Sequence, residues 1–168
     1  MTRLIDSFIF NHTMNPPLYH AVFSPCGHYR YEWHYCWGEG PVCMFIGLNP
    51  SKANGFQMDP TVRRCVDNAQ RWGFGALCMT NLFAWIHPDP EAMKQQPQPI
   101  GPKNDATLKR LAAKAGLVVA AWGCHGNHLQ RGNAVRQMLP NLHALKVNQD
   151  GSPAHPLYLS KKLQPICF

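Results

Sequence analysis

The sequence lacks the features that mark several specialised classes of protein. No window approaches the about 18 apolar residues of a membrane span. The first 30 residues contain no basic region followed by an apolar one, so nothing there resembles a secretory signal, and we expect a cytoplasmic protein with no membrane association. The seven cysteines include no CxxC pair, and an odd number of them favours reduced thiols over a disulfide framework.

Acidic residues are also scarce: the chain has only 9 of them, against 16 basic residues. The formal net charge of +7 is spread over several segments rather than held in one tail, which favours a polyanionic partner. The hydrophobic fraction of 45% is ordinary for a globular protein, and 168 residues are enough to bury a core without a disulfide or a structural metal. We therefore expect residues 1–168 to form a single domain.

Four short apolar runs predict strands that are covered on both faces, because they lack strict alternation. They are VCMFIG (42–47), ALCMT (76–80), LVVAAW (117–122) and LHALKV (142–147). Helical patterns separate them. One begins at Asp59 and Pro60 and ends at Gly73, a second is capped by Asn104 or Asp105, and a weaker third ends before Pro140.

This order predicts an α/β fold of three αβα layers, with a central, mostly parallel four-stranded sheet. In residues 1–41 the run HYRYEWHYCW suggests an N-terminal hairpin that leads into the first core strand. Residues 84–103 form a loop of unusual length with five prolines, and such loops are typically functional or disordered. In open α/β sheets ligands bind beyond the carboxyl ends of the strands, so we expect the site at GLNPS, TNLFAW and AWGCHGN.

Two asparagines follow the first two core strands. Asn49 comes directly after the first strand, beside Pro50 and Ser51, and Asn81 ends the second, two residues before Phe83. A side-chain amide pairs in two-pronged fashion with the edge of a nucleobase, and an aromatic ring stacks on its face. The alternative is structural, because Asn and Ser also hydrogen-bond nearby backbone at turns and aromatic rings pack under long loops.

His155 lies in the segment GSPAHPLYLS (151–160), after the last predicted strand. The prolines around it restrict the backbone, so the imidazole is aimed in advance. A neutral histidine donates a hydrogen bond to negative charge that develops on a leaving group. The alternative is that His155 is an ordinary surface or core residue, since the chain has nine histidines in total.

Taken together, these motifs carry a resemblance. GLNPS, DPTVRR, NLFAW, AWG and HPLYL, over about residues 20–160, are similar to the motifs of an uncharacterised bacterial and phage domain family. That family in turn resembles a branch of the uracil-DNA glycosylase superfamily. There a Gly-x-(Asp/Asn)-Pro strand end, an Asn after the second strand and a late His-Pro-Ser-x-Leu loop occur in the same order.

The resemblance implies roles for individual residues. Asn49 would take the place of the residue that positions water at the anomeric carbon of the sugar, as an amide does in the mismatch-specific uracil/thymine branch. An amide holds water but is a poor base, so the implied turnover is slow unless the leaving base is labile. Asn81 would read the base, with Phe83 beside it, and His155 would stabilise the departing base as an anion.

The same resemblance implies contacts with DNA. Leu159 matches the leucine wedge that fills the gap left by an extruded nucleotide. Pro50, Ser51 and Ser160 would contact the phosphate backbone. Leu157 stands where the late motif of the superfamily has Ser, which removes one expected phosphate contact.

Basic side chains near these motifs are candidates to follow phosphates, which supply most sequence-independent affinity for nucleic acid. Arg63 and Arg64 lie on the first predicted helix, and Lys161 and Lys162 follow the late motif. The alternative is a solvated surface. We prefer that alternative for the basic residues of the second helix, which lie away from the motifs.

Metal sites are the weaker interpretation. The spacing of Cys26, His28, His34 and Cys36 would place four zinc ligands on one face of a hairpin, yet aromatic hairpins carry such residues without metal. The cysteine spacings that hold the iron-sulfur cluster of some superfamily branches do not occur. We therefore predict neither a metal nor another cofactor.

The leading hypothesis is a hydrolase, a monomeric DNA N-glycosylase of uracil-DNA glycosylase type. It would extrude a modified, deaminated or mismatched base and hydrolyse the N-glycosidic bond. Two alternatives stay open. A non-catalytic nucleic-acid or nucleotide-binding protein with the same fold is favoured by the amide at Asn49 and the missing Ser of the late loop. A hydrolase of free nucleosides or nucleotides would show little salt-dependent affinity for DNA.

Overall fold

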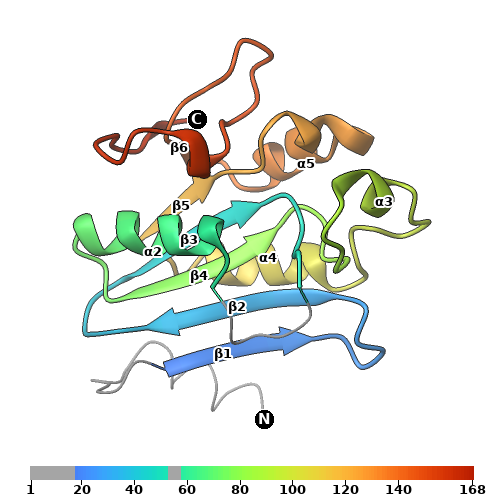
Figure 1. Ribbon diagram of the computed structural model, residues 1–168, viewed down its shortest axis with the longest axis horizontal. Coiled ribbons are helices and arrows are strands. Elements are labelled where there is room, and N and C mark those ends of the chain that lie inside the picture. The colour runs from blue at the N-terminus through green and yellow to red at the C-terminus, as the bar shows by residue number, and fades with distance from the viewer. Residues whose placement is uncertain (1–17, 53–57) are drawn as a thin grey trace.

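The fold is built on one mixed β-sheet. A computed structural model describes residues 18–52 and 58–168, and within them seven strands hydrogen-bond in the order β1-β2-β4-β3-β5-β6-β7 (Figure 1). The strands are β1 (Leu18–Phe23), β2 (Arg30–Cys36), β3 (Val42–Gly47), β4 (Ala76–Asn81), β5 (Leu117–Ala120), β6 (His143–Ala144) and β7 (Ile166–Cys167).

The four predicted core strands form the middle of this sheet. β4, β3, β5 and β6 lie side by side and parallel, although β6 has only two residues. The expected sheet of four strands is nevertheless too small. β1 and β2 form an antiparallel hairpin whose second strand pairs with β4, and β7 pairs antiparallel with β6 at the other edge.

The N-terminal hairpin differs from the one predicted. The run HYRYEWHYCW supplies only the second strand of the hairpin, and the first strand is β1, which lies earlier in the chain. Residues 1–17 of the predicted extension lie outside the described residues. Because β2 continues the sheet beside β4, the hairpin is part of the same layer as the parallel strands.

Helices connect the parallel strands. They are α2 (Pro60–Arg71), α3 (Pro90–Lys94), α4 (Asn104–Ala112) and α5 (Arg131–Met138), with the 3-10 helices η1 (Cys124–Gln130) and η2 (Pro156–Tyr158). The predicted start of the first helix is confirmed. The Asp59 carboxylate accepts a hydrogen bond from the N–H of Val62 at 2.8 Å, and Pro60 occupies the first turn.

The predicted cap of the next helix is wrong. Asn104 is fully buried at the first position of α4 rather than before it. Its amide donates to the backbone carbonyls of Asn81 and Leu82, at 3.0 and 2.9 Å. A polar side chain is tolerated in this interior position because its donors are satisfied by carbonyls that follow β4. Asn104 therefore fixes α4 to the end of that strand.

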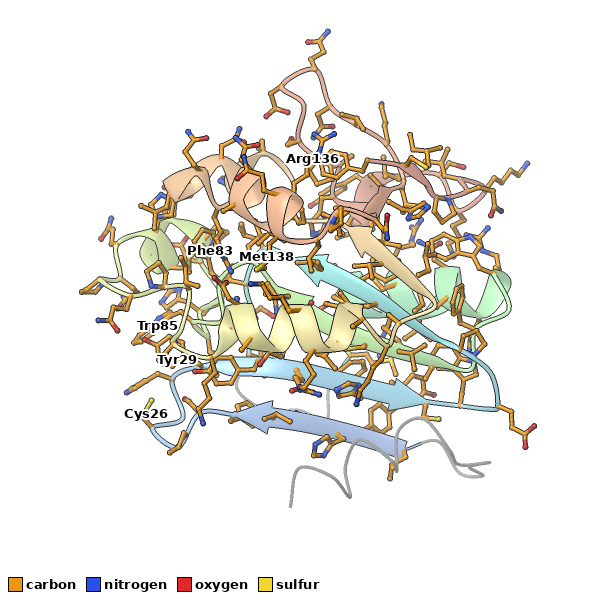
Figure 2. The ribbon with its side chains drawn as sticks, turned by 180° about the vertical axis from the view of Figure 1, so that it is seen from behind. Cys26, Tyr29, Phe83, Trp85, Arg136 and Met138 are labelled. Carbon is orange, nitrogen blue, oxygen red and sulfur yellow. The ribbon has the colours of Figure 1, made fainter. Side chains whose placement is uncertain are left out.

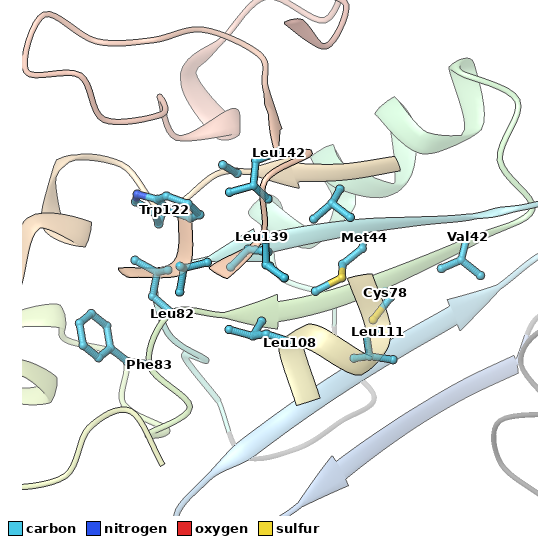
Figure 3. Packing of buried hydrophobic residues seen from close by; sticks show 14 of the residues in the cluster. Val42, Met44, Cys78, Leu82, Phe83, Leu108, Leu111, Trp122, Leu139 and Leu142 are labelled. Atoms are coloured by element: carbon cyan, nitrogen blue, oxygen red, sulfur yellow. The ribbon is translucent and has the colours of Figure 1, made fainter. Parts of the chain in front are cut away.

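Apolar side chains cover both faces of the sheet. On β3, Cys43 and Phe45 pack in the same cluster as residues of α2, whereas Met44 and Ile46 pack with residues of α4 and α5 (Figure 3). All four of these side chains are fully buried. Helices thus lie on both faces of the parallel strands, which is why these strands read as continuous apolar runs.

The long Pro-rich segment 84–103 has more structure than a loop. It contains α3, whose N-terminus is capped by Asp89. Its two ends are held together, because the N–H groups of Ala84 and Trp85 donate to the carbonyls of Ile100 and Pro99, both at 3.1 Å. These pairings fix the segment beside the carboxyl end of β4.

Candidate functional site

A cavity of about 430 Å³ opens at the carboxyl ends of the parallel strands. The chain leaves β3 toward β4 and leaves β5 toward β6, so the two connections run in opposite directions across the sheet. A crevice is expected between strands whose connections diverge in this way. Segments 47–51, 87–90, 121–125 and 155–158 supply most of the lining, and the volume is that of a small-molecule site.

Asn49 lines this cavity with a fixed amide. Its Nδ2 donates to the carbonyls of His87 at 2.8 Å, Pro50 at 3.3 Å and Trp85 at 3.4 Å. Carbonyls accept but never donate, so these three neighbours determine which prong of the amide is nitrogen. Oδ1 is the prong left to accept a hydrogen bond from water or a ligand.

Asn81 also lines the cavity, from the last position of β4. The residue is only 6% exposed, yet its side-chain amide hydrogen-bonds to no residue of the described chain. It lies opposite Gly47 in the parallel ladder, so closely that a Cβ on Gly47 would be 2.8 Å from its Oδ1. Buried polar groups are normally paired, so this amide is available to a ligand in the cavity.

His155 lines the cavity from the segment before η2. Its Nδ1 accepts from the N–H of Leu157 at 3.4 Å, which leaves Nε2 as the protonated nitrogen. Burial lowers the pKa of His155, and the charge of Asp59 opposes this effect only in part. At neutral pH the imidazole is therefore uncharged and donates through Nε2.

The further residues that line the cavity include Arg30, Asp59, Trp122 and Tyr158. Asp59 and Trp122 belong to the motifs DPTVRR and AWG, beside a helix start and a strand end. These positions could have identified both residues as part of the site from the sequence. Arg30 is the first residue of β2, which the sequence analysis placed in a peripheral hairpin. No feature of the sequence indicated that Arg30 lines the site. Burial lowers the pKa of the Arg30 guanidinium, which donates to the carbonyl of Lys52 at 3.1 Å.

Phe83 does not lie where the sequence placed it. It is fully buried in the same cluster as residues of α4 and α5 (Figure 3), and the centroid of its ring lies 5.6 Å from that of the His128 ring. It is absent from the lining of the cavity, so it cannot stack on a base held there. The aromatic side chains that do line the cavity are Trp122 and Tyr158.

Leu159 is likewise a poor fit to the predicted wedge. It is half-buried and packs against the cluster on the α2 face, and its carbonyl accepts from Arg64 Nη1 at 2.8 Å. Its neighbour Tyr158 is 85% exposed and lines the cavity. The exposed ring in this part of the late loop is therefore that of Tyr158, whose centroid lies 5.8 Å from that of the His155 ring.

The predicted phosphate contacts divide into two groups. Pro50 is buried, and its carbonyl accepts from the N–H of His87 at 2.9 Å, while the Ser51 hydroxyl donates to Asp59 at 3.2 Å. Arg64 is bound to the carbonyl of Leu159. The exposed members lie on α2, which contacts η2, and on the segment after η2. They are Arg63, Ser160, Lys161 and Lys162.

The four residues considered for zinc do not assemble. Cys26 is exposed at the turn between β1 and β2 (Figure 2), whereas His34 is buried and its Nε2 lies 2.9 Å from the Glu32 carboxylate. Within residues 18–52 and 58–168, no three His, Cys, Asp or Glu side chains are grouped so as to hold a metal ion.

Comparison with known proteins gives a family but no function. No curated protein and no solved structure matches the sequence. None of the findings links the chain to the uracil-DNA glycosylase superfamily, so that resemblance stays a hypothesis. Among the described residues, no helix has the length and apolar character needed to cross a membrane. A family model matches residues 30–157, and the chain belongs to that family, described as protein of unknown function (DUF1643).

Proposed function

We propose that the protein is an N-glycosidase that holds a nucleobase in the cavity and hydrolyses the bond between base and sugar, with a base in DNA as the leading substrate. The observation that carries this proposal is that Asn49, Asn81 and His155, which lie far apart in the sequence, line one cavity of about 430 Å³. A small-molecule site with a few convergent polar groups is the arrangement such chemistry needs.

Each of the three side chains has a role in the proposed reaction. Asn49 Oδ1 accepts a hydrogen bond from water and directs a lone pair of that water toward the anomeric carbon. The Asn81 amide, buried and without a hydrogen-bond partner among residues 18–52 and 58–168, pairs with the edge of the base. The neutral His155 donates from Nε2 to the base as it departs with negative charge.

We further propose that the fold is uracil-DNA glycosylase-like. The parallel strands β4, β3, β5 and β6, with helices on both faces, support this proposal. The position of the cavity at the carboxyl ends of β3 and β5 supports it as well.

A single-turnover assay tests the function. Enzyme in excess is incubated with DNA that bears uracil, thymine mismatches or hypermodified pyrimidines, and abasic sites and released base are measured. We expect cleavage of at least one substrate, with Asn49→Ala slower by about 100-fold because the water loses its position. Asn133→Ala, an exposed amide on α5, is the matched control and should leave the rate unchanged. Absence of abasic sites from all these substrates would refute the proposal for DNA.

One observation favours a hydrolase of free nucleosides or nucleotides as the second candidate. Leu159 is packed against the α2 face, so it is not free to replace an extruded base in a duplex. This candidate predicts release of free base from nucleosides at a rate that does not depend on salt. The same preparations of wild-type protein and Asn49→Ala, given nucleosides instead of DNA, distinguish the two candidates.

A further inference from the structure

The proposed reaction needs an acceptor for a proton of the attacking water, and Asn49 cannot supply it. An amide is a very weak base, and the nitrogen of Asn49 already donates to three carbonyls. Of the described residues that line the cavity, Asp59 alone carries a carboxylate. It is also close in sequence to Asn49, since it stands at the start of the helix that follows β3.

The Asp59 carboxylate is held in place by neutral donors. Oδ1 accepts from the N–H of Val62 at 2.8 Å, and Oδ2 accepts from the Ser51 hydroxyl at 3.2 Å. No cation of the described chain lies within 4 Å of it, so it is not consumed in an ion pair. Each carboxylate oxygen has lone pairs left for a further hydrogen bond.

The charge of Asp59 extends over the cavity. It opposes the effect of burial on the pKa values of Arg30 on β2 and of His155 before η2. Burial raises the pKa of the Cys65 thiol on α2, and the nearby Cys43 and Asp59 add to this rise. A ligand that contacts His155 in the cavity would therefore experience the negative charge of Asp59.

We propose that Asp59 is the general base of this site, accepting a proton from the water that Asn49 positions. This assignment rests on the proposed function. The water oxygen forms a bond to the anomeric carbon, the bond between that carbon and the base nitrogen breaks, and its electron pair leaves with the base. Asp59 takes one proton of the water, and His155 stabilises the base anion. The proton then passes from Asp59 to the base, which restores the carboxylate and releases neutral base and sugar.

The role as helix cap does not by itself require a carboxylate, because Asn caps helices as well as Asp. Asp59→Asn therefore keeps an oxygen for the N–H of Val62 and removes the charge. In the full chain, with the DNA or nucleoside that the wild-type protein cleaves, we expect kcat to fall by about 100- to 1,000-fold with KM unchanged. Asp67→Asn, an exposed carboxylate on the same helix, is the matched control and should behave as wild type.

NMR titration of His155 supplies a readout independent of turnover. Because the charge of Asp59 raises the pKa of His155, Asp59→Asn should lower that pKa further. The assignment is overturned if the titration of His155 does not move, if kcat is retained, or if the loss appears only in KM, which would make Asp59 a ligand of sugar hydroxyls. If wild-type protein cleaves and Asp59→Asn cleaves equally, the proposed function survives and only this assignment fails. If wild-type protein cleaves neither DNA nor nucleosides, both fail.

Discussion

At the scale of single residues, the two amides of the cavity are held by different means. Asn49 is oriented by hydrogen bonds to carbonyls of segment 85–87 and to its neighbour Pro50. Asn81 has no such bonds and depends on packing, above all on the absence of a side chain at Gly47. The hydrogen bonds of Asn49 fix its amide before a ligand arrives, which lowers the entropy lost on binding.

Gly47→Ala therefore tests the position of the Asn81 amide, because the substitution displaces the amide but leaves Asn81 itself unchanged. The added Cβ would lie 2.8 Å from Asn81 Oδ1, so the amide must rotate away. The backbone of Gly47 does not have a positive φ, so Ala itself is accommodated there. If the amide pairs with a base, we expect the affinity for the best-binding nucleoside to fall by about 5- to 150-fold, as measured by calorimetry.

Gly38→Ala is the control for this substitution, because a Cβ there meets no atom within 4 Å. Its affinity for the same nucleoside should equal that of the wild-type protein. Equal affinity of Gly47→Ala and Gly38→Ala would mean that the Asn81 amide does not contact the base.

Residue positions explain which parts of the site the sequence predicted. Asn49 and Asn81 follow buried strands directly, so the parallel topology places both at one edge of the sheet. Phe83 and Leu159 lie outside the strands and helices. There, one residue can face the cavity while the next packs in the core. Tyr158 faces the cavity while Leu159 packs against α2, and no periodicity in the sequence distinguishes them.

At the scale of elements, a buried polar cluster joins the hairpin to the rest of the fold. Glu32 and His34 on β2 are 2.9 Å apart, Cys78 on β4 lies 4.0 Å from the same histidine nitrogen, and Arg110 on α4 pairs with Glu32. Burial opposes the charge of His34, but Cys78 and Glu32 together raise its pKa to about 10. The cluster therefore links three elements through charge rather than apolar packing.

This cluster predicts how stability changes with pH. In the unfolded chain the histidine releases its proton near pH 6.5, whereas in the folded protein it keeps the proton up to about pH 10. The stabilisation is thus complete below pH 6.5 and is lost as the pH rises from about 6.5 to 10. We expect the free energy of unfolding, from urea titrations at a series of pH values, to fall across this range.

Glu32→Gln tests the contribution of this cluster to stability. The substitution leaves the buried His34 without its carboxylate partner, so we expect the free energy of unfolding at pH 6 to fall by about 3 to 5 kcal/mol. We also expect the free energy of unfolding of the variant to decrease less between pH 6.5 and pH 10 than that of the wild-type protein. Glu39→Gln, at an exposed position before β3, is the control and should change neither. A pH dependence identical in wild type and Glu32→Gln would show that the charge of His34 does not stabilise the fold.

The same cluster explains why the place of β2 in the main sheet was not predicted. Parallel strands β3, β4 and β5 are covered by apolar side chains on both faces and are recognised from that pattern. β2 buries Glu32 and His34, whose polar character conceals a strand of the main sheet. β6 was predicted, although it is shorter than the run 142–147, whereas β7 has two residues, too few for any periodicity to develop.

At the scale of the whole molecule, the excess of basic residues is the property that separates the two candidate substrates. The chain carries a formal charge of +7, and exposed cations lie on α2 and on the segment after η2, next to elements that line the cavity. Of these, Lys161 forms one exposed ion pair with Asp67 at 3.8 Å, which is worth little energy. These cations are therefore available to a phosphate backbone that enters the cavity from this side.

If DNA is the substrate, the logarithm of its binding constant should fall linearly with the logarithm of the salt concentration, because bound cations release counterions. Replacing both Lys161 and Lys162 with Ala should then make the slope shallower by about 0.9 for each phosphate that a lysine neutralises on duplex DNA, or about 0.7 on a single strand. Lys109→Ala, on α4 away from the cavity, should leave the slope unchanged. Fluorescence anisotropy at several salt concentrations measures all three proteins. A slope near zero in the wild-type protein would exclude a DNA backbone as partner and favour free nucleosides, since these carry no phosphates for the cations to neutralise.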